Sequence, residues 1–306
     1  MTPNSDATDL SGLVAVVTGA AAGLGRAEAI GLARAGASIV VNDIAGALDK
    51  SDVIDEITTA GSKAVAVAGD ISQRSTADEL VETADGLGGL SIVVNNAGIT
   101  RDRMLFNMSD EDWDTVIAVH LRGHFLLTRN AATYWRAKAK DGDGTVYGRI
   151  INTSSEAGLA GPVGQANYGA AKAGITALTL SAARALERYG VRANAIAPRA
   201  RTAMTADVFG DSPELAEGQI DPLSPEHVVN LVRFLASPAS QGVNGQLFIV
   251  YGPTVTLVAA PRAEHRFSAE SDAWNPSELS KTLQNYFANS DPERNFSAAA
   301  LMGQGE

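Results

Sequence analysis

Three polar residues in the second half of the chain have the types and spacing of a proton-transfer device. Tyr168 and Lys172 stand four positions apart in the run Tyr-Gly-Ala-Ala-Lys. On a helix such positions share one face, so the Lys172 ammonium can lie beside the Tyr168 phenol. A neighbouring cation is expected to lower the pKa of the phenol from its usual value of about 10. Tyr168 is therefore a candidate general acid and base, and Lys172 is the group that adjusts its pKa.

Ser155 precedes Tyr168 by thirteen residues and is the candidate for steadying the substrate oxygen. A hydroxyl donor aimed at a carbonyl stabilises the negative charge that develops as the carbonyl becomes an alkoxide. The three residues together suit hydride transfer at a secondary alcohol or a ketone. The alternative is that Tyr168 and Lys172 form an ordinary pair on the solvated side of an amphipathic helix.

A glycine-rich motif near the amino terminus favours the catalytic interpretation. An apolar run, 13–17, leads into the sequence TGAAAGLG at 18–25, and a stretch with helical periodicity follows. This order predicts a strand, a loop and a helix whose first amides can hold a pyrophosphate. The alternative for a glycine-rich loop is a simple turn. The predicted cofactor contacts from the loop are Gly19, Ala22, Gly23, Leu24 and Gly25.

Asp43 closes the second apolar run and indicates which dinucleotide is bound. It lies eighteen residues beyond Gly25. A carboxylate at this point can accept hydrogen bonds from ribose hydroxyls and would repel a 2′-phosphate. Ala22 offers no cation for such a phosphate either, so the sequence favours NAD over NADP. The alternative is that Asp43 is a turn or cap residue for the next helix.

The composition is that of a globular protein. The chain has 306 residues, of which 45% are hydrophobic and 19% are charged. Its formal net charge of −11 argues against a nucleic acid or an anionic membrane as partner. The lack of cysteine excludes disulfides, a thiol nucleophile and cysteine metal sites. No apolar run approaches the roughly 20 residues of a membrane span, so a cytoplasmic location is expected.

Alternating strand-like and helix-like segments predict the fold. Apolar runs occur at 13–17, 37–42, 64–68, 91–95, 149–153, 191–196 and 246–250, with helix-like stretches between them. This alternation is typical of an α/β, Rossmann-like, doubly wound parallel sheet, here of about seven strands. We expect a polar segment at 1–11, one dehydrogenase-like domain at 12–258 and a C-terminal extension at 259–306.

The C-terminal extension is expected to contain one helix. Asn275 followed by Pro276 is a good helix start, and Leu279, Leu283 and Phe287 recur at helical spacing. This apolar face is expected to pack against another surface. The helix could pack on its own subunit, cover the substrate cleft of a neighbouring subunit, or become ordered only when subunits assemble.

The motifs, taken in order, resemble the short-chain dehydrogenase/reductase family over about residues 12–258. Besides the glycine loop and Ser155, Tyr168 and Lys172, the family pattern includes Asp70 and the run Asn-Asn-Ala-Gly at 95–98. The resemblance implies a homodimer or homotetramer. It also implies a general acid and base at Tyr168 and ribose contacts from Lys172. Further cofactor contacts are implied at Asp70, Ile71, Asn96, Ala97, Gly98, Pro198 and Thr202.

Within that family the chain most resembles the (3R)-hydroxyacyl-CoA dehydrogenase portion of the peroxisomal multifunctional β-oxidation enzyme and its bacterial relatives. The similarity lies in NNAGITRDRMLFNM at 95–108, VHLRGHF at 119–125 and GQANYGAAKAG at 164–174. It implies a small hydrophobic alcohol or ketone as substrate, CoA-linked or a hydroxysteroid. An apolar lid between Thr202 and Pro225 is expected to close over it. The lid residues are Met204, Val208, Phe209, Leu215 and Ile220.

The chain departs from the family pattern at three positions. His120 stands where most members have an asparagine that organises a proton relay, so we include it only as a supporting site residue. Arg199 replaces a glycine after Pro198, and Thr202 lies one residue closer to that proline than usual. His120 and His124 share the i, i+4 spacing of a metal-ligand pair. No metal is expected, because the motif lacks the accompanying glutamate and cysteines.

Two other functions remain open from the sequence. A 3-oxoacyl-carrier-protein reductase would normally need NADPH and a basic patch for its acidic carrier, which Asp43 and the net charge disfavour. A dinucleotide-binding sensor or scaffold would not need a proton-transfer group, which Ser155, Tyr168 and Lys172 supply.

Overall fold

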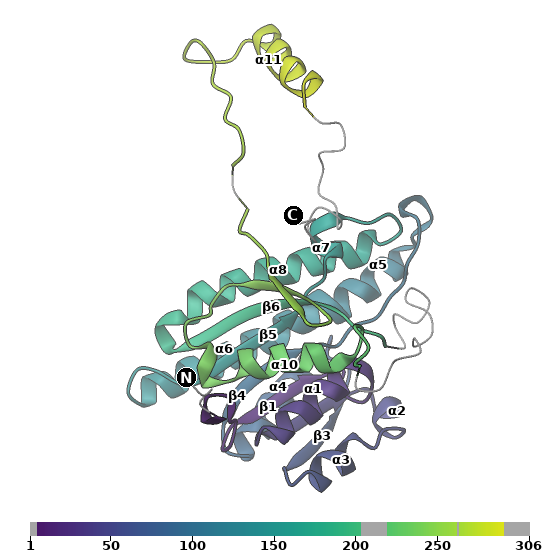
Figure 1. The fold of residues 1–306 in the computed structure, drawn as a ribbon, viewed down its shortest axis with the longest axis vertical. Helices are drawn as coiled ribbons and strands as arrows, with labels where there is room; N and C mark the ends of the chain where they lie inside the picture. Colours follow the sequence, from purple (N-terminus) through teal and green to yellow (C-terminus); the bar gives the residue numbers. More distant parts are fainter. Residues whose placement is uncertain (1–4, 203–218, 262, 291–306) are drawn as a thin grey trace.

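Runs of valine, isoleucine and alanine form the centre of the molecule as buried strands. The structure is a computed structural model, and it describes residues 5–202, 219–261 and 263–290. Its single sheet has the strand order β3-β2-β1-β4-β5-β6-β7-β8 (Figure 1). The strands are β1 (Val14–Thr18), β2 (Ser38–Asp43), β3 (Ala64–Ala68), β4 (Leu90–Asn95), β5 (Gly148–Thr153), β6 (Val191–Arg199), β7 (Leu247–Tyr251) and β8 (Thr254–Leu257).

Seven of the strands run parallel, which confirms the predicted α/β sheet, and the eighth differs. β8 pairs with β7 in the antiparallel sense, so that Tyr251 faces Thr254 across a two-residue turn. Gly252 makes this turn possible, because its φ of 53° lies in the left-handed region that favours glycine. The short hairpin adds an edge strand that the pattern of apolar runs did not predict.

Helices cover both faces of the sheet. One core cluster joins α1 and α3 with α10, and the other joins α4, α6 and α8 (Figure 1). The helices are α1 (Gly23–Arg34), α2 (Ala45–Leu48), α3 (Val53–Thr59), α4 (Arg74–Gly86), α5 (Asp110–Ile117), α6 (Gly123–Asp141), α7 (Ala157–Ala160), α8 (Ala166–Leu186), α10 (Pro225–Ala236) and α11 (Pro276–Ala288). Among the described helices, none is long and apolar enough to cross a membrane.

The order of the strands creates a crevice at one edge of the sheet. From β1 the chain winds through β2 to β3 on one side, and from β4 through β5 to β7 on the other. In doubly wound sheets ligands bind outside the carboxyl ends of the strands at such a reversal. The glycine loop follows β1, and the Asn-Ala-Gly segment follows its neighbour β4.

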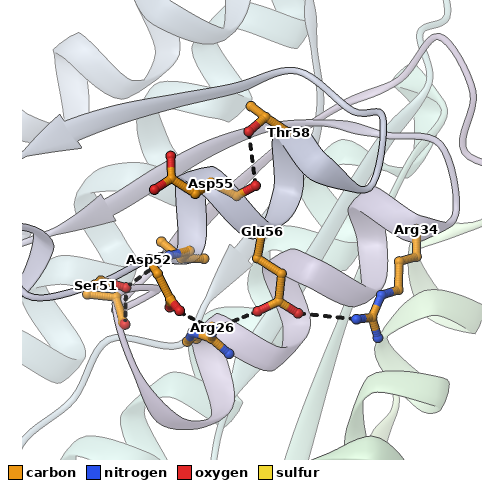
Figure 2. Close-up of polar contacts among 9 residues, drawn as sticks. Arg26, Arg34, Ser51, Asp52, Asp55, Glu56 and Thr58 are labelled. Atoms are coloured by element: carbon orange, nitrogen blue, oxygen red, sulfur yellow. Dashed lines mark hydrogen bonds and ion pairs between the residues drawn. The ribbon is translucent and has the colours of Figure 1, made fainter.

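A charged network fixes α3 against α1 beside the glycine loop (Figure 2). Arg26 donates to Asp52 at 2.7 Å and to Glu56 at 2.6 Å, and Arg34 reaches the other oxygen of Glu56 at 3.1 Å. Ser51 adds a hydrogen bond from its hydroxyl to the carbonyl of Ala21 in the loop, at 2.6 Å. These contacts hold the α3 end of the segment between β2 and α3 close to the glycine loop.

Candidate active site

A cavity of about 500 Å³ lies at the carboxyl edge of the sheet. It brings together nearly all of the residues that the sequence predicted for cofactor binding. Those lining it are Gly19, Ala22, Gly23, Leu24, Asp43, Asp70, Ile71, Asn96, Ala97, Gly98, His120, Tyr168, Lys172, Pro198 and Thr202. Of the residues predicted for catalysis and cofactor binding, only Gly25 and Ser155 do not line this cavity. Other residues that line the cavity were not predicted from the sequence, including Asn42, Ile44, Ile99, Thr153 and Ala200.

The glycine loop is held tightly against the segment after β4. Gly19 has a φ of 66°, and a Cβ there would lie 2.8 Å from the Cα of Ala97. A Cβ on Gly25 would collide with the carbonyl oxygen of Gly19 and the side-chain amide of Asn96. Gly25 therefore has a packing role behind the loop. Because glycines have no side chains, the main-chain amides of the loop are accessible from the cavity. Such amides can bind a pyrophosphate.

Thr18 links the two segments and was missed by the sequence analysis. Its Oγ1 accepts the main-chain N–H groups of Asn96 at 3.0 Å and Ala97 at 3.1 Å. The Asn96 side chain returns a hydrogen bond to the Thr18 carbonyl at 3.1 Å. The one sequence feature that could have indicated this role is that Thr18, a residue with a hydroxyl group, directly precedes Gly19.

Asp43 has the main-chain contacts of a turn residue, the alternative role that the sequence left open. One carboxylate oxygen accepts from the amide of Ile44 at 2.8 Å, as a turn residue would. The other accepts from the amide of Ala21 at 3.1 Å, which ties the end of β2 to the glycine loop. The side chain also lines the cavity. At the end of β3, Asp70 similarly accepts the amide of Ser72 at 2.8 Å.

Tyr168 differs from expectation in the direction of its pKa shift. It lies in the first turn of α8, and burial of its phenol raises the pKa above the usual 10.0, with the charge of Asp102 acting in the same direction. A hydrogen bond with Ser155 opposes this shift without offsetting it. The predicted lowering by Lys172 is not found: removal of the phenol from water raises the pKa of Tyr168, and Lys172 is not among the groups that shift it. Tyr168 therefore holds its proton at neutral pH.

Lys172 lies one turn further along α8 and is completely enclosed. Its ammonium donates to the carbonyl of Thr153, at the end of β5, at 2.6 Å. The nitrogen is 5.4 Å from the centre of the Tyr168 ring. Burial lowers the pKa of Lys172 to about 7, because the charged form is poorly solvated there. The geometry agrees with the predicted pairing of the two side chains.

Ser155 begins the segment that follows β5. Its hydroxyl oxygen accepts the amide of Ala157 at 3.1 Å and is hydrogen-bonded to Tyr168. The next residue, Glu156, forms a two-point ion pair with Arg199 at 2.6 and 2.9 Å. The arginine that departs from the family pattern therefore connects the end of β6 to the segment that carries Ser155.

His120 is packed between Tyr168 and the segment after β4. It belongs to a π-helical turn, Ala118–Arg122, between α5 and α6. Its ring meets the Tyr168 ring edge-on with centroids 5.2 Å apart, and Nε2 lies 3.0 Å from the amide nitrogen and 2.8 Å from the oxygen of Ile99. Burial, assisted by the charge of Lys172, lowers the His120 pKa to about 3, so the ring is neutral at physiological pH.

The His120 and His124 pair does not form the core of a metal site in the described part of the chain. No group of three or more His, Cys, Asp or Glu side chains there is arranged so that it could hold a metal ion. Both imidazoles are buried, and burial lowers the pKa of His124 well below its usual value.

A second, largely apolar pocket of about 610 Å³ is lined in part by Ala157 and Gly169, which lie close to Ser155 and Tyr168 in the sequence. Its walls come from the segment before α5 and from the segment joining α7 to α8. The residues with large apolar side chains that line it are Met104, Leu105, Phe106, Leu159 and Val163. Of the predicted lid residues, Met204, Val208, Phe209 and Leu215 lie outside the described residues, and Ile220 is exposed.

A doubly wound sheet with a glycine-lined cavity and a tyrosine–lysine pair at its switch point defines a class of dinucleotide-dependent oxidoreductase. The family model described as short chain dehydrogenase matches residues 13–212. The chain belongs to the short-chain dehydrogenase/reductase family and is a dehydrogenase of that family, as the sequence predicted. Members use a nicotinamide dinucleotide, and the glycine cradle of this cavity fits such a cofactor.

Three similar proteins span different parts of the chain. Hydroxyacyl-CoA dehydrogenase ChsB1 of Mycobacterium tuberculosis is 74% identical over 305 residues, which is 98% of this chain and 96% of that protein. Peroxisomal multifunctional enzyme type 2 of Mus musculus is 42% identical over 78% of this chain but only 31% of its own length. A 3-oxoacyl-[acyl-carrier-protein] reductase of Synechocystis is 40% identical over 81% of this chain and 99% of that protein.

A solved structure supports the fold. The crystal structure of a short chain dehydrogenase from Mycobacterium avium aligns with a TM-score of 0.83 at 44% identity. The alignment covers 95% of this chain and 99% of that one.

Proposed function

We propose that this dehydrogenase oxidises a (3R)-hydroxyacyl-CoA to the 3-ketoacyl-CoA with NAD, in a reversible reaction. The observation that carries the proposal is that Tyr168 lines the cofactor cavity, while its neighbour Gly169 lines the apolar pocket that contains Leu105 and Phe106, together with Ala157, whose amide donates to Ser155. The high identity to a hydroxyacyl-CoA dehydrogenase supports this substrate class. A hydroxysteroid is the second candidate, because an apolar pocket selects for bulk and hydrophobicity rather than for one molecule.

The protein's own part in the reaction is proton transfer and orientation. Tyr168 donates its proton to the ketone oxygen in reduction and accepts the alcohol proton in oxidation. Ser155 donates a hydrogen bond to the same oxygen, and Lys172 supplies positive charge and a ribose contact. When bound, the nicotinamide supplies or accepts the hydride. Because the Tyr168 pKa is raised, the rate of oxidation is expected to increase with pH as the phenolate forms.

We propose His120 as a positioning residue for this site. Its ring supports one side of the Tyr168 ring and is fixed by the main chain of Ile99. Gly98 leaves the room for it, because a Cβ at Gly98 would collide with the imidazole. A neutral, buried imidazole in this place adds no positive charge beside Lys172.

The choice of NAD over NADP rests on the charges around the end of β2. Asp43 presents a carboxylate at the cavity, where a 2′-phosphate would be repelled. Arg26, the first cation after the glycine loop, is already held by Asp52 and Glu56. Ala22 contributes no charge. We therefore expect no basic side chain from these elements to receive a 2′-phosphate.

Three further expectations accompany this proposal. The net charge of −11 disfavours docking of an acidic carrier protein, so a carrier-protein reductase is the less suitable enzyme. A sensor or scaffold would not require the enclosed Tyr168 and Lys172. We expect a cytoplasmic homodimer or homotetramer.

One assay separates the candidate substrates and cofactors. Formation of NADH is measured with (3R)- and (3S)-hydroxyacyl-CoA of several chain lengths, hydroxysteroids and simple secondary alcohols, and each is repeated with NADP. We expect turnover of the (3R) thioesters with NAD, and a smaller NAD preference in Asp43→Asn. Turnover confined to steroids or small alcohols would reject the acyl-CoA substrate and leave the dehydrogenase class unchanged. Equal use of NADP by the unaltered protein would reject the role of Asp43.

A further inference from the structure

An ion pair joins the segment that carries Ser155 to one wall of the cofactor cavity. Glu156 follows Ser155 directly in the chain, and Arg199 is the last residue of β6. Nε of Arg199 donates to one carboxylate oxygen of Glu156 at 2.6 Å, and Nη2 donates to the other at 2.9 Å. Pro198 and Ala200, on either side of Arg199, line the cofactor cavity. The ion pair therefore connects the segment of a proposed catalytic side chain to the cofactor wall.

The geometry of the ion pair fixes the orientation of both groups. The side chains of Glu156 and Arg199 are only 13% and 29% exposed, and two parallel hydrogen bonds join them. Arg199 is itself held by the sheet, because its main chain pairs with Tyr251 of β7. Its guanidinium carbon also lies over the Tyr251 ring, 5.5 Å from the centroid. Arg199 is thus the fixed partner, and Glu156 is the residue that it holds in place.

Ser155 lies between two connections to β6. On one side, the amide of Ser154 donates to the Ile196 carbonyl at 2.7 Å. On the other side, the Glu156 side chain is held by Arg199. The helix that follows, α7, has only four residues and packs against α8. A helix of this length has little stability of its own, so the position of Ser155 relative to the cofactor wall depends on the two connections to β6.

The position of the Ser155 hydroxyl matters because it has to meet the substrate oxygen while the reacting carbon faces the nicotinamide. A hydrogen-bond donor stabilises a developing alkoxide only when it lies at the right distance from it. A misplacement of about 1 Å can lower a rate by about 10²-fold, even when the altered residue lies away from the reacting atoms. A contact that sets the distance between Ser155 and the cofactor wall therefore acts on the rate.

We infer that Glu156 and Arg199 are positioning residues, whose ion pair holds the Ser155 hydroxyl at the distance from the cofactor wall that hydride transfer requires. A glycine at position 199, as in the family pattern, offers no side chain for such a pair. The inference rests on the proposed role of Ser155 but not on the identity of the substrate. It applies to any alcohol that the enzyme oxidises, because each presents a hydroxyl oxygen to Ser155.

A comparison of two backgrounds tests whether the ion pair acts through Ser155. Arg199→Gln removes the charge and the two-point contact, and it is introduced both into the wild type and into Ser155→Ala. The rate of NADH formation from a (3R)-hydroxyacyl-CoA should fall about 10-fold in the first background and less than about 2-fold in the second. Slow variants are measured with the enzyme in excess over the thioester. NAD affinity, titrated by fluorescence, should stay close to that of the wild type, because the sheet still holds β6.

Two further variants sharpen the comparison. Glu156→Gln keeps the size of the side chain and should repeat the pattern of Arg199→Gln, and the double variant should be no slower than either single one, because all three lose the same pair. Lys138→Gln is the matched control, since it breaks an ion pair with Asp85 at 3.2 Å, and neither residue lines either pocket. It should leave turnover unchanged. Thermal unfolding shows that each protein assayed is folded.

Three results would overturn the inference. They are turnover of Arg199→Gln within about 2-fold of the wild type, an equal fold-loss in the Ser155→Ala background, or unchanged turnover at saturating NAD with weakened NAD binding. A wild type that does not oxidise the (3R)-hydroxyacyl-CoA would reject the proposed substrate alone. The same comparison is then made with the hydroxysteroid or secondary alcohol that the wild type does oxidise.

Discussion

Lys172 and Glu28 are both buried without a salt-bridge partner among the described residues, and they serve different purposes. Lys172 keeps one hydrogen bond to the Thr153 carbonyl and lies beside Tyr168, where its charge can act on the reaction. Glu28, in α1, is fully buried, and neither carboxylate oxygen has a hydrogen-bond partner. Burial raises the pKa of Glu28 to about 8. No step of the proposed reaction depends on this carboxyl group. Its burial therefore affects only the free energy of unfolding.

Glu28→Gln is expected to stabilise the protein increasingly as the pH rises. The unfolded carboxyl group loses its proton above its usual pKa of 4.5, whereas the folded one retains it up to about 8. The wild-type free energy of unfolding should therefore fall relative to the variant across this range, by at most about 1.4 kcal/mol per pH unit. Lys172 is present in both proteins, so its own titration cancels.

Urea unfolding at about pH 5 and about pH 7.5 measures this difference. Glu111→Gln, at an exposed position of α5, is the control and should show almost no pH-dependent difference. A constant offset between Glu28→Gln and the wild type at both pH values would contradict the raised pKa of Glu28.

At the scale of elements, the position of the glycine loop depends on the close packing of α1 against α10. Gly31 faces Val229 of α10, and a Cβ at Gly31 would collide with the Cγ1 atom of that valine. Valine has few side-chain conformations in a helix, so the collision cannot be relieved without moving one of the helices. The packing of α1, and with it the loop at its amino end, therefore relies on a glycine far from the cofactor.

Gly31→Ala is expected to destabilise the protein by about 1–3 kcal/mol through overpacking. Adding Val229→Ala removes the colliding atom and should recover most of the loss, apart from the small cost of the deleted valine methyl groups. Gly46→Ala in α2 is the matched control, because a Cβ there meets nothing within 4 Å. Thermal unfolding of the four proteins provides the comparison. A fully stable Gly31→Ala protein would show that α1 and α10 adjust freely.

The parallel strands and the cofactor loop could be predicted because their signals are local. Apolar runs at regular intervals give the strands, and the glycine spacing after β1 gives the loop. The β8 hairpin was missed because its four-residue strand, Thr254–Leu257, is short and mostly exposed. The direction of the Tyr168 pKa shift was wrong for another reason. Desolvation depends on tertiary packing around the phenol, which residue spacing does not reveal.

At the scale of the whole molecule, the reversal of strand order collects residues that are distant in the sequence. β1 and β4 lie side by side, so the glycine loop and the Asn96 segment meet through Thr18. The ends of β5 and β6 bring Ser155 and Pro198 to the same edge, and α8 adds Tyr168 and Lys172. The C-terminal segment that carries α11 extends away from this body (Figure 1).

The central claim is that Tyr168 transfers the proton in a reaction whose cofactor binds independently of the phenol hydroxyl. Its most direct test is Tyr168→Phe, assayed for NADH formation with a (3R)-hydroxyacyl-CoA and titrated with NAD by fluorescence. Turnover should fall by about 10²- to 10⁴-fold, the usual contribution of general acid/base catalysis, while NAD affinity stays close to that of the wild type. Turnover within a few-fold of the wild type would contradict the account.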